Sequence, residues 1–198
     1  MKVIGLTGSI GSGKSTVSAY LARKGYLIID SDLLAKELVK KGRPALKEIE
    51  EVFGKKVIAS DGELDRAEMA KIVFKHPKKK SLLEDIVTKR VIKEIKKELN
   101  ALKKIGHKGI VFVDAPILFE SKADIPMNEI WVVVADDKIR AKRVRARDGS
   151  TLEEFNRRSS SQLPQEEKIK LADKVIENNG TERQLYSRIR SLLKEIDA

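Results

Sequence analysis

Apolar residues along this chain alternate between short continuous runs and longer stretches with helical spacing. The first run, Val3 to Thr7, and a second, Tyr26 to Ile29, contain no charged residue, which is typical of strands buried on both faces of a parallel sheet. Further strands are expected at 110–113 and 130–134, with a short last one at 174–176. Because helical patterns separate most of these runs, we predict an α/β fold built on a doubly wound parallel sheet.

The helical stretches are bounded by glycine and proline. The expected ranges are 14–23, 33–40, 44–53, 65–74, 78–104 and 137–147, then a helix capped by Ser150 that runs to about 161, and a final helix after the last strand. The four helices between 33 and 104 follow one another without a strand. Since this part is neither of low complexity nor rich in glycine and serine, we expect an inserted helical subdomain rather than a linker.

A glycine-rich loop joins the first strand to the first helix. Residues 8–15 read Gly-Ser-Ile-Gly-Ser-Gly-Lys-Ser and fit G-x-x-x-x-G-K-[ST] at every fixed position. Such a loop turns its N–H groups toward phosphate oxygens, and the following helix adds its positive N-terminus. We therefore expect a nucleoside triphosphate, with Lys14 at the β- and γ-phosphates, the Ser15 hydroxyl on Mg²⁺ and Thr16 in support. The alternative is a turn that matches by chance.

Acidic residues follow the second strand, where a parallel sheet places its ligands. Phosphoryl transfer to an alcohol needs a carboxylate that accepts the hydroxyl proton, and Asp32 is our candidate for this base. Asp30 suits a metal-orienting or acceptor-binding role. Either both carboxylates face the same cleft, or one caps the following helix and the other acts. The competing interpretation is a helix N-cap at Ser31 or Asp32.

Another acidic residue, Asp114, ends the strand at 110–113. P-loop proteins place the carboxylate that meets Mg²⁺ at this point, whereas the alternative is a plain turn before Pro116. We find no D-x-x-G switch and no base-reading N/T-K-x-D motif at a suitable place, which disfavours a GTPase.

The helix at 137–147 is strongly cationic. It carries Lys138, Arg140, Lys142, Arg143, Arg145 and Arg147. Arg143 and Arg147 are four residues apart and share a face, so they can stabilise charge on a transferring phosphoryl group, while a solvated surface explains most of the others. Asn178, after the last strand, is either part of a turn or a contact for an adenine edge.

Composition narrows the possible partners. The net charge is +11, from 41 Lys and Arg against 30 Asp and Glu, but the nine aromatic residues form no base-stacking basic patch, so we expect no nucleic acid as substrate. The absence of cysteine excludes disulfides and thiolate chemistry and is compatible with the cytoplasm. The longest apolar stretch, 109–119, is too short and too interrupted to span a membrane.

Taken in order, the motifs resemble those of the dephospho-CoA kinase family over nearly the full length. They are the loop at 5–16, Asp30-Ser31-Asp32, Gly62-Glu63-Leu64-Asp65-Arg66 with Phe74, the segment 114–120, Arg143 with Arg147-Asp148, Gln162, and the segment 172–180. The resemblance implies a P-loop nucleotide-kinase fold with a core (about 1–31, 107–137 and 172–198), a helical acceptor-binding region (about 32–106) and a lid (about 138–171). It also implies transfer of the ATP γ-phosphoryl group to the ribose 3′-hydroxyl of dephospho-CoA, giving coenzyme A and ADP.

The same resemblance implies roles for individual residues. Gly11, Ser12, Gly13, Lys14, Ser15 and Thr16 would hold the ATP phosphates, Asp32 would accept the proton, Arg143 and Arg147 would belong to the lid, and Asn178 would lie on the adenine side. Asp65, Arg66, Leu118, Phe119 and Glu120 would lie near the acceptor. We expect ATP and dephospho-CoA as small-molecule partners, Mg²⁺ as cofactor, and a monomer or small homo-oligomer.

One departure from the family pattern lies in the long helix. Thr88 and Lys89 stand where the family commonly has His-Pro. Two other functions stay open at this point: a different small-molecule kinase, of nucleoside monophosphate or shikimate type, and a P-loop protein that binds nucleic acid. The choice of acceptor separates the first, and steeply salt-dependent binding to DNA or RNA would identify the second.

Overall fold

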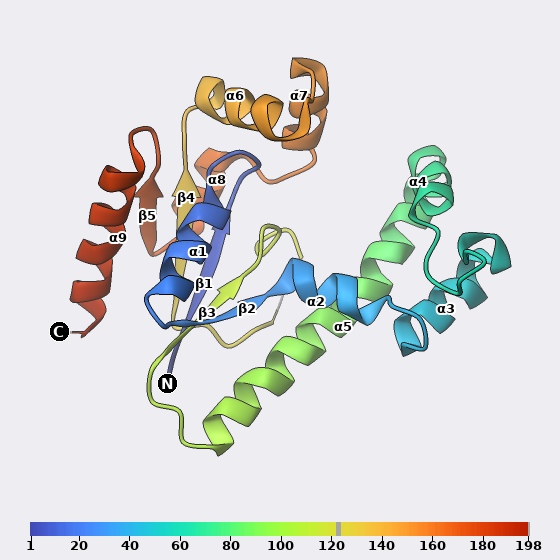
Figure 1. The fold of residues 1–198 in the computed structure, drawn as a ribbon, viewed down its shortest axis with the longest axis horizontal. Coiled ribbons are helices and arrows are strands. Elements are labelled where there is room, and N and C mark those ends of the chain that lie inside the picture. Colours follow the sequence, from blue (N-terminus) through green and yellow to red (C-terminus); the bar gives the residue numbers. More distant parts are fainter. Residues whose placement is uncertain (122–123, 198) are drawn as a thin grey trace. The chain divides into compact units, whose positions relative to one another are not determined.

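The computed structural model describes residues 1–121 and 124–197, and these residues contain a five-stranded sheet in the order β2-β3-β1-β4-β5 (Figure 1). The strands are β1 (Lys2–Gly8), β2 (Leu27–Asp30), β3 (Ile110–Asp114), β4 (Glu129–Val134) and β5 (Lys174–Glu177). β1 lies at the centre and pairs in parallel with β3 and β4, and β4 pairs in parallel with β5. The predicted doubly wound α/β sheet is therefore confirmed.

The helices follow the predicted ranges closely. They are α1 (Lys14–Arg23), α2 (Ser31–Leu38), α3 (Pro44–Phe53), α4 (Arg66–Lys75), α5 (Pro77–Lys104), α6 (Asp137–Asp148), α7 (Leu152–Ser160), α8 (Gln165–Leu171) and α9 (Glu182–Asp197), with a 3₁₀ turn at Lys55–Val57. Two details differ. The N-cap of α7 is Thr151 rather than Ser150, and α8 is a separate short helix that the sequence pattern did not predict.

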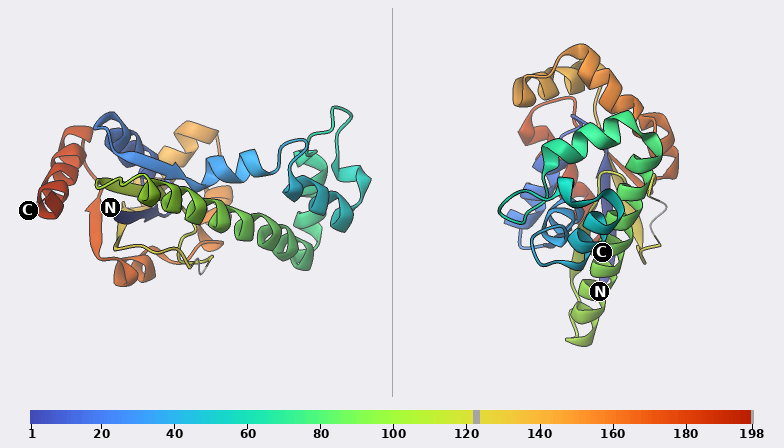
Figure 2. Two further views of the ribbon diagram at one scale, coloured as in Figure 1. Left: turned by 90° about the horizontal axis from the view of Figure 1, so that it is seen from below. Right: turned by 90° about the vertical axis from the view of Figure 1, so that its right-hand side faces the viewer.

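The chain divides into two compact units, 1–29 with 106–198 and 30–105. The first unit holds the sheet, α1 and α6 to α9. Its main core lies between the sheet and α1 and α9, and is formed by residues such as Leu6, Val17, Trp131 and Ile189. Figure 2 shows α8 on the opposite side of the sheet from α1, and α8 contacts β4. The sheet is thus covered on both faces, which explains its uninterrupted apolar strands.

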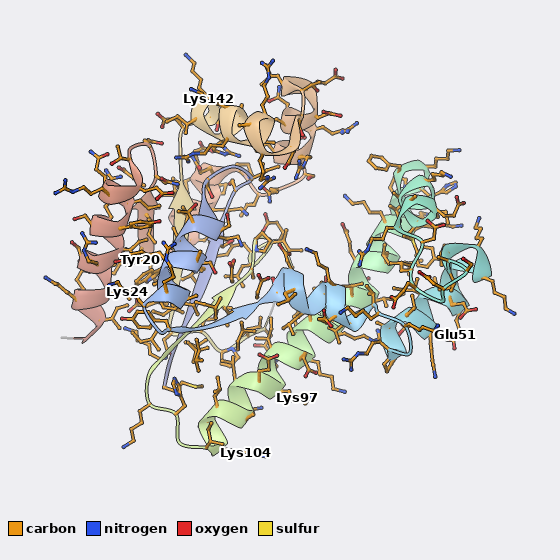
Figure 3. The ribbon with its side chains drawn as sticks, in the orientation of Figure 1. Tyr20, Lys24, Glu51, Lys97, Lys104 and Lys142 are labelled. Carbon is orange, nitrogen blue, oxygen red and sulfur yellow. The ribbon has the colours of Figure 1, made fainter. Side chains whose placement is uncertain are left out.

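Aromatic contacts fix α1, the helix that begins at the glycine-rich loop. Tyr20 stacks on Tyr186 of α9 with 4.3 Å between ring centroids, and the Lys24 ammonium lies 5.9 Å from the centre of the Tyr20 ring (Figure 3). Offset-stacked rings contribute about 0.5–1.5 kcal/mol beyond the area they bury. These contacts therefore hold α1 near its C-terminal end.

The second unit consists of helices joined by turns, with one isolated antiparallel bridge between Ile58 and Leu64. Apolar residues from α3, α4, α5 and the 3₁₀ turn form its core, including Ile49, Val57, Met69 and Ile86. α5 runs without a break through Thr88 and Lys89. Among the described residues, no helix is both long enough and apolar enough to cross a membrane.

Candidate active site

The glycine-rich loop leaves β1 and ends at the first residue of α1. Gly11 and Gly13 have φ angles of 78° and 91°, in the left-handed region, and the Ser12 N–H donates to the Ser9 carbonyl over 3.0 Å. Gly13 is the N-cap of α1 and has no side chain that could occupy the first-turn N–H groups. The Thr16 N–H donates to the Gly13 carbonyl at 3.0 Å, whereas the N–H groups of the first helical residues, Lys14 and Ser15, have no carbonyl one turn before them in the helix. The loop and the helix start therefore form an anion-binding site.

Neighbouring groups approach these two glycines so closely that a side chain would not fit. A Cβ on Gly11 would lie 2.6 Å from the Arg140 carbonyl oxygen, and one on Gly13 would lie 2.1 Å from the Asn178 side-chain nitrogen. Both positions also have the positive φ that glycine tolerates best. The loop conformation therefore depends on glycine for space as well as for backbone geometry.

An ion pair joins the loop to the end of β3. The Lys14 ammonium contacts the Asp114 carboxylate, and the two side chains are only 16% and 5% exposed. Asp114 follows the last apolar residue of β3 and lies opposite Leu6 of β1 in the sheet register. The structure therefore brings together two residues expected to act on the triphosphate and its metal ion.

Arg143 and Asn178 lie against the same loop. Arg143 donates from Nη1 to the Ser12 carbonyl at 3.3 Å and from Nη2 to the Asn178 carbonyl at 2.9 Å. Asn178 is buried, and its side-chain amide donates to the Ser12 carbonyl at 2.8 Å. These bonds fix the Ser12 carbonyl from two sides and hold a guanidinium next to the phosphate loop.

Arg147, one turn further along α6, lies in a different environment. It is exposed and donates from Nε and Nη2 to the two oxygens of Asp148, at 2.6 and 2.7 Å. Arg158 also donates to Asp148, at 2.8 Å. The hydrogen bonds from Arg147, and then those from Arg158, hold the pKa of the Asp148 carboxyl well below its ordinary value. Lys142, also on α6, is exposed on the outer side of the helix (Figure 3).

Lys168, for which the sequence predicts no role, fixes the segment that follows β3. Lys168 of α8 is fully buried, pairs with Glu120 at 2.8 Å and donates to the Pro116 carbonyl at 3.1 Å. Glu120 also accepts from the Leu163 N–H at 2.9 Å. Glu120, which we expect near the acceptor, thus has one carboxylate oxygen bound by residues of the first unit. Leu118, from the same segment, is buried, and Phe119 is half-buried.

In the helical unit, Asp30 caps α2. Its Oδ1 accepts from the N–H groups of Asp32 and Leu33, both at 2.9 Å. The alternative that Ser31 or Asp32 is the cap is therefore wrong, because Asp30 is the N-cap of α2. Asp32 lies exposed in the first turn of the helix.

The remaining predicted acceptor residues surround the start of α4. Asp65 is the N-cap of this helix and accepts from the Glu68 N–H at 2.9 Å, while its own N–H donates to the Val57 carbonyl at 2.8 Å. Arg66 is exposed at the first helical position. In α5, Thr88 is half-buried and Lys89 is exposed.

These features define a P-loop kinase. The phosphate loop lies on a parallel sheet with β1 at its centre, and the Lys14–Asp114 pair and Arg143 adjoin it. A family model described as dephospho-CoA kinase matches residues 2–184. The chain belongs to the dephospho-CoA kinase family, whose members phosphorylate dephospho-CoA with ATP in the last step of coenzyme A biosynthesis.

Individual relatives support this assignment. The chain is 41% identical over 195 residues to a dephospho-CoA kinase of Carboxydothermus hydrogenoformans, with 98% of this chain and 94% of the relative covered. It is 39% identical to the one of Enterococcus faecalis, over 98% of this chain and 96% of the relative. Among solved structures it resembles dephospho-CoA kinase from Campylobacter jejuni, with a TM-score of 0.74 and 28% identity over 99% of this chain and 98% of that one. A protein from Thermus thermophilus, TT1252, gives a TM-score of 0.82 and 35% identity over 98% and 97% of the two chains.

Proposed function

We propose that this protein transfers the γ-phosphoryl group of ATP to the ribose 3′-hydroxyl of dephospho-CoA, with Asp32 as the general base. The hydroxyl oxygen forms a bond to the γ-phosphorus, the bond from that phosphorus to the ADP oxygen breaks, and the hydroxyl proton passes to the Asp32 carboxylate. The products are coenzyme A and ADP. The observation that carries this proposal is the phosphate loop that opens into the start of α1.

On the nucleotide side, the backbone from Gly11 to Thr16 and the Lys14 ammonium hold the β- and γ-phosphates. The loop has the geometry for this, with glycine at both left-handed positions and an uncapped helix start. Asn178 keeps its amide on Ser12 and contributes to ATP binding by fixing the loop beneath the nucleotide.

Mg²⁺ fits the oxygen donors at this site. The Asp114 carboxylate and the Ser15 hydroxyl are hard ligands of the type that Mg²⁺ prefers, and the described residues contain no cluster of three or more acidic, histidine or cysteine side chains that could hold a metal without a substrate. Mg²⁺ is usually bound by one or two carboxylates together with substrate phosphates. Asp114 and Ser15 would hold Mg²⁺, which would neutralise negative charge on the phosphates, and the Lys14 ammonium would contact the same phosphates.

The role of Asp32 is supported by the capping of α2. Asp30 supplies the acceptor for both first-turn N–H groups, so the Asp32 carboxylate is not needed for the cap. The exposed Asp32 carboxylate is therefore available to accept a proton from a substrate hydroxyl, as a general base requires.

Arg143 and Arg147 stabilise the charge that develops on the phosphoryl group. Arg143 is already in place beside the loop, whereas Arg147 must exchange its exposed pairing with Asp148 for the phosphate. On the acceptor side, the exposed Arg66 offers a cation to the phosphates of dephospho-CoA.

The other acceptor-side residues have internal partners as well. Asp30 and Asp65 cap helices through Oδ1, Glu120 pairs with Lys168 through Oε1, and the buried Leu118 with the half-buried Phe119 supplies apolar surface. We propose that they shape the acceptor region from these fixed positions. The reaction belongs to the cytoplasm, where ATP is available, and the protein acts as a monomer or small homo-oligomer.

The test of this assignment is Asp32→Asn. We expect a loss of at least about 100-fold in kcat, because general acid–base catalysis contributes about 10²–10⁴-fold, while the dissociation constant for ATP stays within about twofold. Single-turnover phosphoryl transfer and calorimetric titration with Mg-ATP measure the two quantities. The matched control is Asp85→Asn, an exposed aspartate of α5 in the same unit. Unchanged turnover in Asp32→Asn would remove Asp32 from the role of base.

A further inference from the structure

Ile10, within the phosphate loop, has its backbone bound on both sides by side chains from distant parts of the chain. Its N–H donates to the Gln162 side-chain oxygen at 2.8 Å, and its carbonyl accepts from Arg140 Nε at 3.0 Å. Gln162 lies in the turn after α7, and Arg140 lies on α6. All three residues belong to the same compact unit.

Arg140 is held too firmly to serve as a phosphate ligand itself. It is only 4% exposed, and it donates from Nη1 to Asp137 at 2.6 Å and from Nη2 to the Ser159 hydroxyl at 3.0 Å. Its guanidinium carbon lies 5.5 Å from the centre of the Phe155 ring. The guanidinium therefore links α6 to α7 and presents Nε to the loop.

These two bonds fix the planes of two successive peptide units. A trans peptide is planar, and its C=O and N–H groups point in opposite directions. The Ile10 carbonyl and the Gly11 N–H belong to one such unit, so Arg140 determines where the Gly11 N–H points. Gln162 fixes the unit that joins Ser9 to Ile10, because it takes the Ile10 N–H, and the Ser9 carbonyl on the opposite side of that unit accepts from the Ser12 N–H at 3.0 Å. Glycine at position 11, with φ of 78°, would otherwise let the loop turn freely.

We propose that Arg140 and Gln162 are positioning residues that set the affinity for ATP by fixing the conformation of the phosphate loop, without touching the nucleotide. Arg140 sets the direction of the Gly11 N–H, and Gln162 holds the Ser9–Ile10 peptide unit. The proposal rests on the assignment of this loop to the ATP phosphates. It gives the α6–α7 segment a part in ATP binding that is separate from the charge of Arg143 and Arg147. The resemblance to the family includes Gln162 among its matching residues, but sequence alone gives no partner for it.

The experiment uses Gln162→Ala and Arg140→Met in the full-length protein, each with a matched control. Gln165→Ala removes an equivalent bond elsewhere, since the Gln165 side chain accepts from the Ala135 N–H at 3.2 Å. Arg145→Met removes an exposed arginine from α6. Calorimetric titration with Mg-ATP gives the dissociation constant, steady-state assays give KM for ATP and for dephospho-CoA, and thermal unfolding monitors stability.

We expect Gln162→Ala and Arg140→Met each to raise the dissociation constant and KM for ATP about tenfold, as the loss of one well-placed hydrogen bond allows. KM for dephospho-CoA and both control variants should stay within about twofold of the wild type. Because both bonds hold the same residue, the double variant should lose less than the product of the two single effects.

The proposal would be overturned if the dissociation constant and KM for ATP rose no more than in the control variants. It would also be overturned if KM rose equally for both substrates. If Arg140→Met does not fold, Gln162→Ala decides, because it removes a single described bond. Failure of the loop assignment itself would be seen separately, as absence of Mg-ATP binding by the wild-type protein.

Discussion

Lys168 is a buried charge whose partners explain why a lysine is present inside the first unit. Its ammonium neutralises Glu120 and donates to the Pro116 carbonyl, so two points of the segment after β3 are fixed to α8. Breaking a buried pair by removing one partner is costly because the other charge stays behind. This segment begins at Asp114, so the pair also supports the end of β3 on which the proposed metal ligand lies.

Lys168→Met should therefore lower the free energy of unfolding by about 3 kcal/mol, at the low end for a buried pair because Glu120 is 21% exposed. Urea unfolding measures this loss. Adding Glu120→Gln should restore at least about 1 kcal/mol, since the amide keeps the acceptor for Leu163 and removes the charge. Lys170→Met, which changes an exposed lysine of the same helix, should stay within about 0.5 kcal/mol of the wild type. A double variant that is less stable than Lys168→Met would contradict this account.

The sequence pattern explains why the phosphate loop contains glycines, but it does not predict which groups surround them. The glycine pattern is local, whereas Asn178 lies 166 residues from the Ser12 carbonyl that it binds, and Gln162 lies 152 residues from Ile10. No spacing rule connects such distant positions. For the same reason the sequence predicts a turn or an adenine contact at Asn178, but it does not predict the bond from Asn178 to the loop.

Among the helices, α7 shows how a local pattern can allow two starts. Ser150 with Glu153 and Thr151 with Glu154 both fit the capping-box spacing, and the structure forms the second pair. The Glu154 N–H donates to the Thr151 hydroxyl at 3.2 Å, and the Thr151 N–H donates to the Glu154 carboxylate at 2.8 Å. Local pattern alone cannot choose between two adjacent caps.

Thr151→Ala should destabilise the protein by about 1 kcal/mol, since loss of an N-cap side chain costs about 0.5–2 kcal/mol. Ser150→Ala should change stability by less than about 0.5 kcal/mol. Urea unfolding gives both values, and faster hydrogen exchange confined to α7 amides in Thr151→Ala would locate the effect. A larger cost in Ser150→Ala than in Thr151→Ala would mean that α7 begins one residue earlier.

The sequence pattern does not predict α8, because the buried residue of this helix is charged. Lys168 is fully buried, while Ile169 and Leu171 are 37% and 54% exposed, so the helix has no apolar stripe facing the core. The long helix α5 was found because its buried residues, Ile86, Val91, Ile95 and Leu99, keep helical spacing. Elements that bury apolar side chains can thus be predicted from sequence, and an element that buries an ion pair cannot.

For the molecule as a whole, the continuous apolar strands predicted the parallel sheet because both of its faces are covered. The breaks at glycine and proline predict a helical insertion, and residues 30–105 form a compact unit in the structure. A net charge of +11 favours capture of anionic substrates, and both ATP and dephospho-CoA are anions. Phosphate loop, fold and family membership all indicate a kinase, so the choice of acceptor is the central claim.

The most direct test measures ADP release from Mg-ATP with dephospho-CoA, AMP, shikimate, adenosine or no acceptor, and identifies the product by mass. We expect ADP release that depends on dephospho-CoA, with coenzyme A formed in equal amount. The other acceptors should give no more than the rate without acceptor. Faster release with another acceptor, or release that no acceptor changes, would contradict the assignment and show that the phosphate loop serves a different reaction.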